Sequence, residues 1–153
     1  MSSRSWIVTS IPFVLWASAG CGPSDTYHGA TAFSAEERAE IESAVLEAAD
    51  RTGGEPRHVV WDNGDDGDNR ILRAQPPDPK ADGQYLMSSQ SYARTIYIRP
   101  NLPTERTRRA ALHEFLHSYG LCHHNEVGVM DERMTSEWSE ADERECVRVG
   151  MCR

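Results

Sequence analysis

Residues 113–123 read HEFLHSYGLCH, the pattern H-E-x-x-H-x-x-G-x-x-H, and this stretch decides the expected fold. Side chains four positions apart lie on one face of an α-helix, so His113 and His117 can offer two imidazoles to one metal ion. A catalytic zinc site has three protein ligands and a water, so a third ligand must come from elsewhere. Gly120 can take a left-handed conformation, end the helix and turn the chain back, which places His123 to complete the set.

The elongated pattern resembles that of the metzincin zinc peptidases. In that family a methionine, the Met-turn, lies beneath the metal site shortly after the third histidine, and Met130 matches it within residues 126–130, EVGVM. The short run from His123 to Met130 is most similar to the matrixins, although His124 stands where matrixins usually have Ser. The resemblance implies an α+β, zincin-like fold. We expect a twisted mixed sheet of about four to five strands, an N-terminal helix, a zinc-binding helix and a C-terminal helix after the Met-turn.

The same resemblance implies a zinc-dependent endopeptidase. His113, His117 and His123 would bind one zinc ion, and Glu114 would act as the general base that activates the zinc-bound water and then protonates the departing amine. Three alternatives stay open. They are a surface-anchored zinc- or peptide-binding module without peptidase activity, an interaction lipoprotein whose motif is accidental, and an enzyme that hydrolyses a non-peptide amide.

The start of the chain, residues 1–21, has the pattern of an export signal. A positively charged beginning is followed by an apolar run at residues 7–17, which is too short to span a bilayer comfortably. Residues 18–21, SAGC, resemble a bacterial lipobox and would make Cys21 the lipidated first residue, which is the interpretation we favour. The ASA at residues 17–19 is also a signal-cleavage site. Both interpretations predict an extracytoplasmic protein, either a membrane-anchored lipoprotein of the cell envelope or a secreted protein.

Composition limits the remaining organisation and the partners. Residues 22–33 carry Gly, Pro, Ser and Thr with little periodicity and are predicted to be a tether, which leaves residues 34–153 as a single catalytic domain. The formal net charge of −8 disfavours nucleic acid and anionic membrane surfaces. We therefore expect no nucleic-acid binding, and membrane contact only through a lipid on Cys21. We also expect a monomer, and the resemblance to metzincins implies a peptide or protein substrate.

Local patterns predict the secondary structure around the motif. Ser34 and Glu37 form a capping box at the start of a first helix, and Ser139 and Asp142 form another before a short last helix. β-rich runs predict strands at residues 57–61, 71–74, 84–89 and 93–99. By resemblance, the third of these strands forms the upper rim of the cleft and pairs with substrate backbone. An ordinary edge strand is the alternative.

The turn at residues 62–69, DNGDDGDN, is dense in carboxylates and suggests a Ca²⁺ site, because hard cations prefer oxygen ligands. It fails the EF-hand template, since counting from Asp62 places Arg73 where the bidentate Glu should be. Turn chemistry alone explains these residues, so an exposed turn is the favoured interpretation and calcium the alternative.

Four cysteines, at positions 21, 122, 146 and 152, fit an oxidising compartment. If Cys21 is lipidated, we predict a disulfide between Cys122 and Cys146 that ties the zinc loop to the last helix. The segment that starts at Cys21 also resembles the matrixin cysteine switch, in which a propeptide thiolate binds the zinc. A closed structural zinc site would instead require Cys122 or His124 as a fourth ligand.

Overall fold

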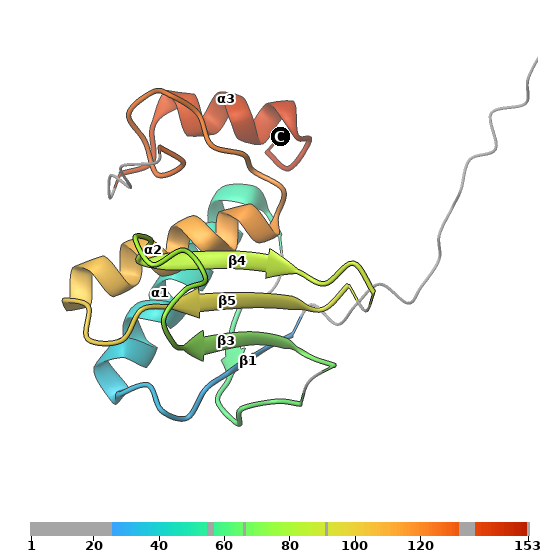
Figure 1. Cartoon of the computed structure of the whole chain (residues 1–153). Helices are drawn as coiled ribbons and strands as arrows, with labels where there is room; N and C mark the ends of the chain where they lie inside the picture. Colours follow the sequence, from blue (N-terminus) through green and yellow to red (C-terminus); the bar gives the residue numbers. More distant parts are fainter. Residues whose placement is uncertain (1–25, 55–56, 66, 91, 132–136, 153) are drawn as a thin grey trace, which may run out of the picture.

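The computed structural model describes residues 26–54, 57–65, 67–90, 92–131 and 137–152. These residues form an α+β architecture with one mixed sheet, which confirms the coarse fold class expected from the sequence (Figure 1). The strands are β1 (Tyr27–Gly29), β2 (Val59–Val60), β3 (Asn69–Arg73), β4 (Gly83–Met87) and β5 (Arg94–Ile98). The helices are α1 (Ala35–Thr52), α2 (Thr104–Ser118) and α3 (Glu140–Arg148).

The five strands lie in the order β2-β1-β3-β5-β4. In this spatial order, β2, β1, β3 and β5 pair in parallel with their neighbours. Strand β4 runs antiparallel to β5 and forms one edge of the sheet. Helices α1 and α2 cover one face (Figure 1). Burial of the side chains alternates along the strands, as expected for a sheet with one covered face. Ile71 and Ile96 are fully buried, whereas Leu72 and Tyr97 are only half-buried. The antiparallel strand at the edge next to α2 is the one that borders the candidate site.

The structure corrects the tether predicted over residues 22–33. Strand β1 belongs to this stretch and lies between β2 and β3 within the sheet. Tyr27 is fully buried, and its ring lies edge-on to Phe115 with 5.2 Å between the ring centroids. Three residues are too few to show a period-2 pattern, and the neighbouring strands that pair with β1 come from far along the chain. The folded domain therefore begins before Ser34.

Both predicted capping boxes are present. At the start of α1, the Ser34 hydroxyl accepts a hydrogen bond from the Glu37 amide at 3.1 Å, and the Glu37 carboxylate accepts one from the Ser34 amide at 2.7 Å. At the start of α3, Ser139 and Asp142 make the same reciprocal pair. These contacts span three residues, so the local sequence was enough to predict them.

The disulfide predicted between Cys122 and Cys146 is wrong. Cys146 is bonded to Cys152 with 5.2 Å between their Cα atoms, and Cys122 is free and exposed. The reason lies in the end of α3, where Gly150 has φ 77° and reverses the chain. The Cys152 amide then donates to the Cys146 carbonyl at 3.3 Å, which brings the two side chains together.

The acidic turn at residues 62–69 makes the contacts expected of a turn. Asp62 and Asp65 each accept a hydrogen bond from the backbone amide two residues further on. Asp62 also pairs with the His28 ring, with 2.7 Å between Oδ1 and Nδ1. These carboxylates act within the turn itself, as in the favoured interpretation, and the calcium alternative stays a prediction.

The export signal, the lipobox and Cys21 lie outside the residues that the structure describes. Those interpretations therefore stay predictions. Within the described ranges, no helix has both the length and the apolar character needed to cross a bilayer.

The carboxylate of Asp142 joins α3 to the segment that precedes and contains Met130. Asp142 is fully buried and accepts hydrogen bonds from the Val129 amide at 2.9 Å, the Met130 amide at 2.8 Å and the His124 ring at 2.9 Å. The amide and hydroxyl of Ser139 donate to it at 2.8 Å. Burial would raise the pKa of this carboxyl, but the Met130 amide, the His124 ring and the other donors hold it below its ordinary value.

Asp142→Asn should lower the free energy of unfolding by about 2–4 kcal/mol at pH 7. The carboxylate accepts hydrogen bonds at two oxygens, whereas the Asn side chain has only one accepting oxygen. Urea unfolding followed by circular dichroism measures this change. The folded-state pKa of Asp142 is depressed, so its contribution is complete at neutral pH. The difference from wild type should narrow as the pH falls below about 4 and through the folded-state pKa.

Asp50→Asn is the matched control, since Asp50 pairs with Arg57 on the surface and its side chain is 69% exposed. It should cost less than about 1 kcal/mol. Equal destabilisation by the two substitutions would contradict the role given to Asp142.

Candidate metal centre

Helix α2 presents two histidines on one face. The opposite face of the helix packs Leu112, Phe115 and Leu116 into the core, and this packing fixes the rotation of the helix about its axis. His113 and His117, one turn apart, then lie with their Nε2 atoms 3.1 Å from each other. His113 is 4% exposed, and His117 is half-buried. Apolar burial therefore aims the two imidazoles in a common direction.

The chain reverses immediately after α2. Gly120 has φ 93°, its amide donates to the His117 carbonyl at 2.9 Å, and the Leu121 amide donates to the Leu116 carbonyl at 3.1 Å. This pair of hydrogen bonds is a Schellman motif, for which glycine is the preferred residue at the left-handed position. The side chains of Leu116 and Leu121 are both buried beside it. The reversal sends the following residues back over the histidine face.

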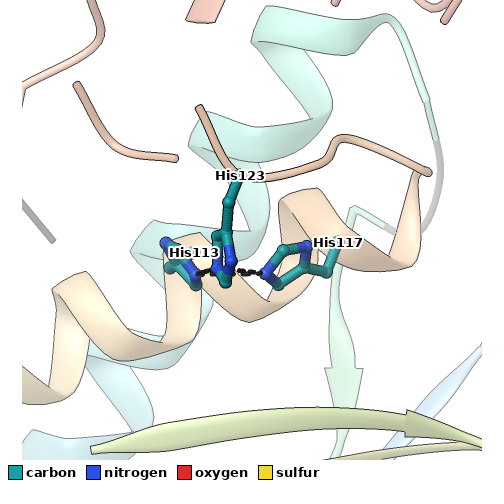
Figure 2. A group of neighbouring side chains, drawn as sticks. All are labelled: His113, His117 and His123. Carbon is teal, nitrogen blue, oxygen red and sulfur yellow. Dashed lines mark hydrogen bonds between the residues drawn. The ribbon is translucent and has the colours of Figure 1, made fainter. Parts of the chain in front are cut away.

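His123 comes from this returning segment and meets the two helix histidines (Figure 2). Its Nε2 atom lies 2.8 Å from Nε2 of His113 and 3.0 Å from Nε2 of His117. Three nitrogens at these separations share a point about 2 Å from each of them, which matches the length of a zinc–nitrogen bond. In the described part of the chain, these three histidines are the group of side chains whose ligand atoms could hold a metal ion together.

The other ring nitrogens of the helix histidines contact backbone carbonyls. Nδ1 of His113 lies 2.7 Å from the Val129 oxygen, and Nδ1 of His117 lies 2.8 Å from the Leu121 oxygen. A carbonyl only accepts, so each Nδ1 carries the proton and each Nε2 presents a lone pair to the centre. Burial, followed by the neighbouring His117, lowers the pKa of His113 to about 4, which keeps this imidazole neutral. Nitrogen lone pairs that lie this close together suit the binding of a cation between them.

The ligand type leaves the identity of the metal open. Imidazole nitrogens suit zinc, copper, iron and nickel alike. The two neighbours considered as a fourth ligand do not belong to the group: the His124 ring contacts Asp142, and the free Cys122 thiol is exposed and does not lie with the three histidine nitrogens. Among the described residues the group therefore consists of three protein ligands, the number found in catalytic zinc sites.

Glu114 lies beside the histidines and is only 4% exposed. Burial raises the pKa of its carboxyl to about 7, and hydrogen bonding to the Tyr85 amide offsets part of this rise. A group with this pKa can both accept and release a proton near neutral pH. The side chain next to the candidate metal ligands is thus suited to proton transfer.

A cleft of about 560 Å³ opens in front of this group. One wall is formed by β4 and the loop before it, and the other by α2 and the His123 segment. The lining residues are Asp78, Lys80, Ala81, Gly83, Gln84, Tyr85, His113, Glu114, His117 and His123. The three histidines and Glu114 therefore share one opening to solvent.

The free edge of β4 faces outward from the sheet. Hydrogen bonds join Asp82 to Arg99 and Ser88 to Ala93 at the two ends of the β4–β5 ladder. Along an antiparallel strand, residues whose N–H and C=O groups bond to the neighbouring strand alternate with residues whose N–H and C=O groups point away from it. The N–H and C=O groups of the odd-numbered residues of β4, among them Tyr85, therefore point away from β5.

Met130 is fully buried in the turn that follows His123, and its carbonyl accepts a hydrogen bond from the His124 amide at 3.2 Å. The residue before it, Val129, supplies the carbonyl that contacts His113. The motif did not point to the carbonyls of Val129 and Leu121, because every residue carries such a group. Tertiary placement alone gives these two a role at the site.

Gly83 is another residue that the motif analysis missed. A Cβ atom at this position would lie 2.9 Å from Cγ and 3.1 Å from Oε1 of Glu114, and 3.2 Å from the Tyr97 carbonyl oxygen. Only glycine lets β4 pass this close to the carboxylate. A glycine at the start of a strand was the available sequence signal.

Comparison of the sequence with known protein families gave no match, and comparison with curated proteins gave none either. The function is therefore inferred from the motif and from the geometry of this site.

His117→Ala should weaken metal binding by more than about 100-fold, because it removes one of three ligands. Titration with Zn²⁺ in a chelator-buffered series, and metal analysis after dialysis, measure this loss. His58→Ala is the control, since His58 is exposed and lies outside the group. Wild-type protein that takes up no metal, or an equal loss in the two variants, would contradict the assignment.

Proposed function

We propose that the protein is a zinc-dependent endopeptidase of the metzincin type. One observation carries the proposal, namely that three convergent imidazoles and the buried Glu114 carboxylate line a single open cleft. Three protein ligands are the set used by catalytic zinc sites, whereas structural sites are usually closed by four ligands. The spacing of these residues, H-E-x-x-H-x-x-G-x-x-H, agrees with this choice of reaction.

His113, His117 and His123 would hold the ion through their Nε2 atoms. Zinc would supply a Lewis acid that polarises the scissile carbonyl and makes a coordinated water more acidic. The Glu114 carboxylate accepts a proton from the attacking water as the carbon–oxygen bond forms. It then gives that proton to the nitrogen of the leaving amine as the carbon–nitrogen bond breaks. Glu114 is unchanged at the end of the reaction.

The substrate is proposed to be an extended peptide chain. Strand β4 is an edge strand, and its outward backbone groups other than the Tyr85 N–H, which hydrogen-bonds to Glu114, can add one more strand to the sheet. Its residues Gly83 to Tyr85 line the same cleft as Glu114 and the histidines. Backbone pairing at β4 would therefore hold a peptide across the catalytic group without selecting a particular side chain.

We also propose that the protein acts outside the cytoplasm. The proposal rests on the export pattern of residues 1–21, with Cys21 as the site of lipid attachment if the lipobox is used. The cysteine content fits this location, because disulfides such as Cys146–Cys152 persist in oxidising compartments.

Glu114→Gln should lower kcat/KM by about 10²–10⁴-fold while the zinc content stays near that of wild type, because the amide cannot accept the proton. Cleavage of a mixed peptide library followed by mass spectrometry, with metal analysis of the same samples, checks both parts. Glu105→Gln is the control on the same helix, since Glu105 is exposed and pairs with Arg109. If both proteins hold zinc and wild type cuts no peptide, a zinc- or peptide-binding module becomes the better explanation.

Gly83→Ala should lower kcat/KM by about tenfold to a hundredfold with zinc still bound, because the added methyl group displaces the Glu114 carboxylate and leaves the histidines in place. Gly67→Ala serves as the matched control, since a Cβ there meets only the Asp65 carboxylate at 3.3 Å in an exposed turn. Full activity of Gly83→Ala would show that the close approach of β4 does not position Glu114.

A further inference from the structure

Lys80 is the only lysine in the 153-residue sequence. Many of the arginines pair with carboxylates, as Arg108 does with Glu47 and Arg144 with Glu126. Lys80 is exposed, and within the described ranges its ammonium has no ion-pair partner. It nevertheless lines the cleft that contains the candidate metal ligands. A cation in this place is left free to meet a group that enters the cleft.

The backbone that carries Lys80 is held firmly. The Arg99 guanidinium donates to the Pro79 carbonyl at 2.6 Å and, through Nε, to the Ala81 carbonyl at 3.0 Å, on either side of the lysine. The carboxylate of Asp78 accepts a hydrogen bond from the Lys80 amide at 2.9 Å. The loop therefore fixes the Cα position of Lys80, while its four-carbon stem can still adapt to a ligand.

Asp82 fixes the far end of the same loop. It is buried, forms an ion pair with Arg106 of α2, and lies 3.8 Å from the Arg99 guanidinium. These contacts join the loop to the helix that carries His113 and His117. The position of Lys80 relative to the candidate metal ligands is consequently set by the fold.

Lys80 is the only lysine or arginine among the described residues that line the cleft, and negative charges surround it. The whole chain has a formal net charge of −8, which repels carboxylates at long range. The other charged side chains in the cleft are Glu114 and Asp78. The Asp78 carboxylate caps the turn through the Lys80 amide and makes no ion pair with the Lys80 ammonium among the contacts of the described residues. The positive charge of Lys80 is therefore available to a substrate carboxylate.

We infer that Lys80 selects peptides that carry a carboxylate on the segment lying beside the beginning of β4, next to Gly83. The inference rests on the proposed endopeptidase function and names a specificity-determining residue for it. Antiparallel pairing, the commoner arrangement, places the C-terminal part of a bound peptide at this end of β4. The carboxylate then lies on the C-terminal side of the cleaved bond. It belongs either to an Asp or Glu side chain or to the end of the peptide chain.

The test compares kcat/KM for matched peptides on the zinc-loaded protein. Each pair differs only by Asp against Asn, or Glu against Gln, at positions C-terminal to the cleaved bond, and a separate pair differs by a free or an amidated C-terminus. Wild type should prefer the carboxylate by about threefold to fivefold, mainly through KM, and high salt should reduce this preference. The pair that shows the effect identifies the source of the carboxylate.

Lys80→Gln should abolish the preference for the carboxylate, and Lys80→Glu should reverse it. Arg144→Gln is the control, because Arg144 is an exposed cation on α3 that lies outside the cleft. An unchanged preference in Lys80→Gln would overturn the inference and leave the proposed function standing. A zinc-loaded wild-type protein that cuts no peptide would overturn both.

Discussion

The backbone of Val129 links the C-terminal helix to the candidate metal centre. Its N–H donates to the buried Asp142 carboxylate of α3, and its C=O contacts Nδ1 of His113. A charge buried at Asp142 is stable only because several aimed donors surround it, so the turn that supplies them cannot move independently. The same turn fixes the tautomer and the ring orientation of His113. The stability of α3 and the geometry of the metal centre therefore depend on one set of hydrogen bonds.

The sheet edge imposes a second constraint on the site. Strand β4 passes so close to α2 that Gly83 leaves no room for a side chain beside Glu114. This approach buries the carboxylate and raises its pKa, and the strand that makes the approach is the edge strand of the sheet. One packing contact thus places Glu114 and the strand edge proposed to bind a peptide in the same cleft. The loop that carries Lys80, tied down by Arg99, completes the wall of that cleft.

Local patterns were sufficient wherever the physical cause is local. The capping boxes at Ser34 and Ser139 depend on residues three positions apart, and a helix places His113 and His117 one turn apart on one face. Glycine is the preferred residue where a helix ends in a left-handed backbone conformation, as at Gly120. The return of the chain toward His123 could therefore also be predicted from the sequence. The coarse α+β class was expected from the resemblance of the motif to the metzincins, and the structure confirms it.

Long-range packing decided the rest. Tyr27 belongs to a strand only because residues more than thirty positions away pair with it, and no short window of sequence contains that information. Cys146 meets Cys152 because Gly150 reverses the chain, a geometry that the cysteine spacing alone did not fix. Thus the sequence by itself determined the ligand types, their spacing and the helix that carries them. The tertiary structure decided which backbone carbonyls orient the candidate ligands, how deeply Glu114 is buried, and that Lys80 lines the same cleft. These features depend on the packing of segments that are distant in the sequence.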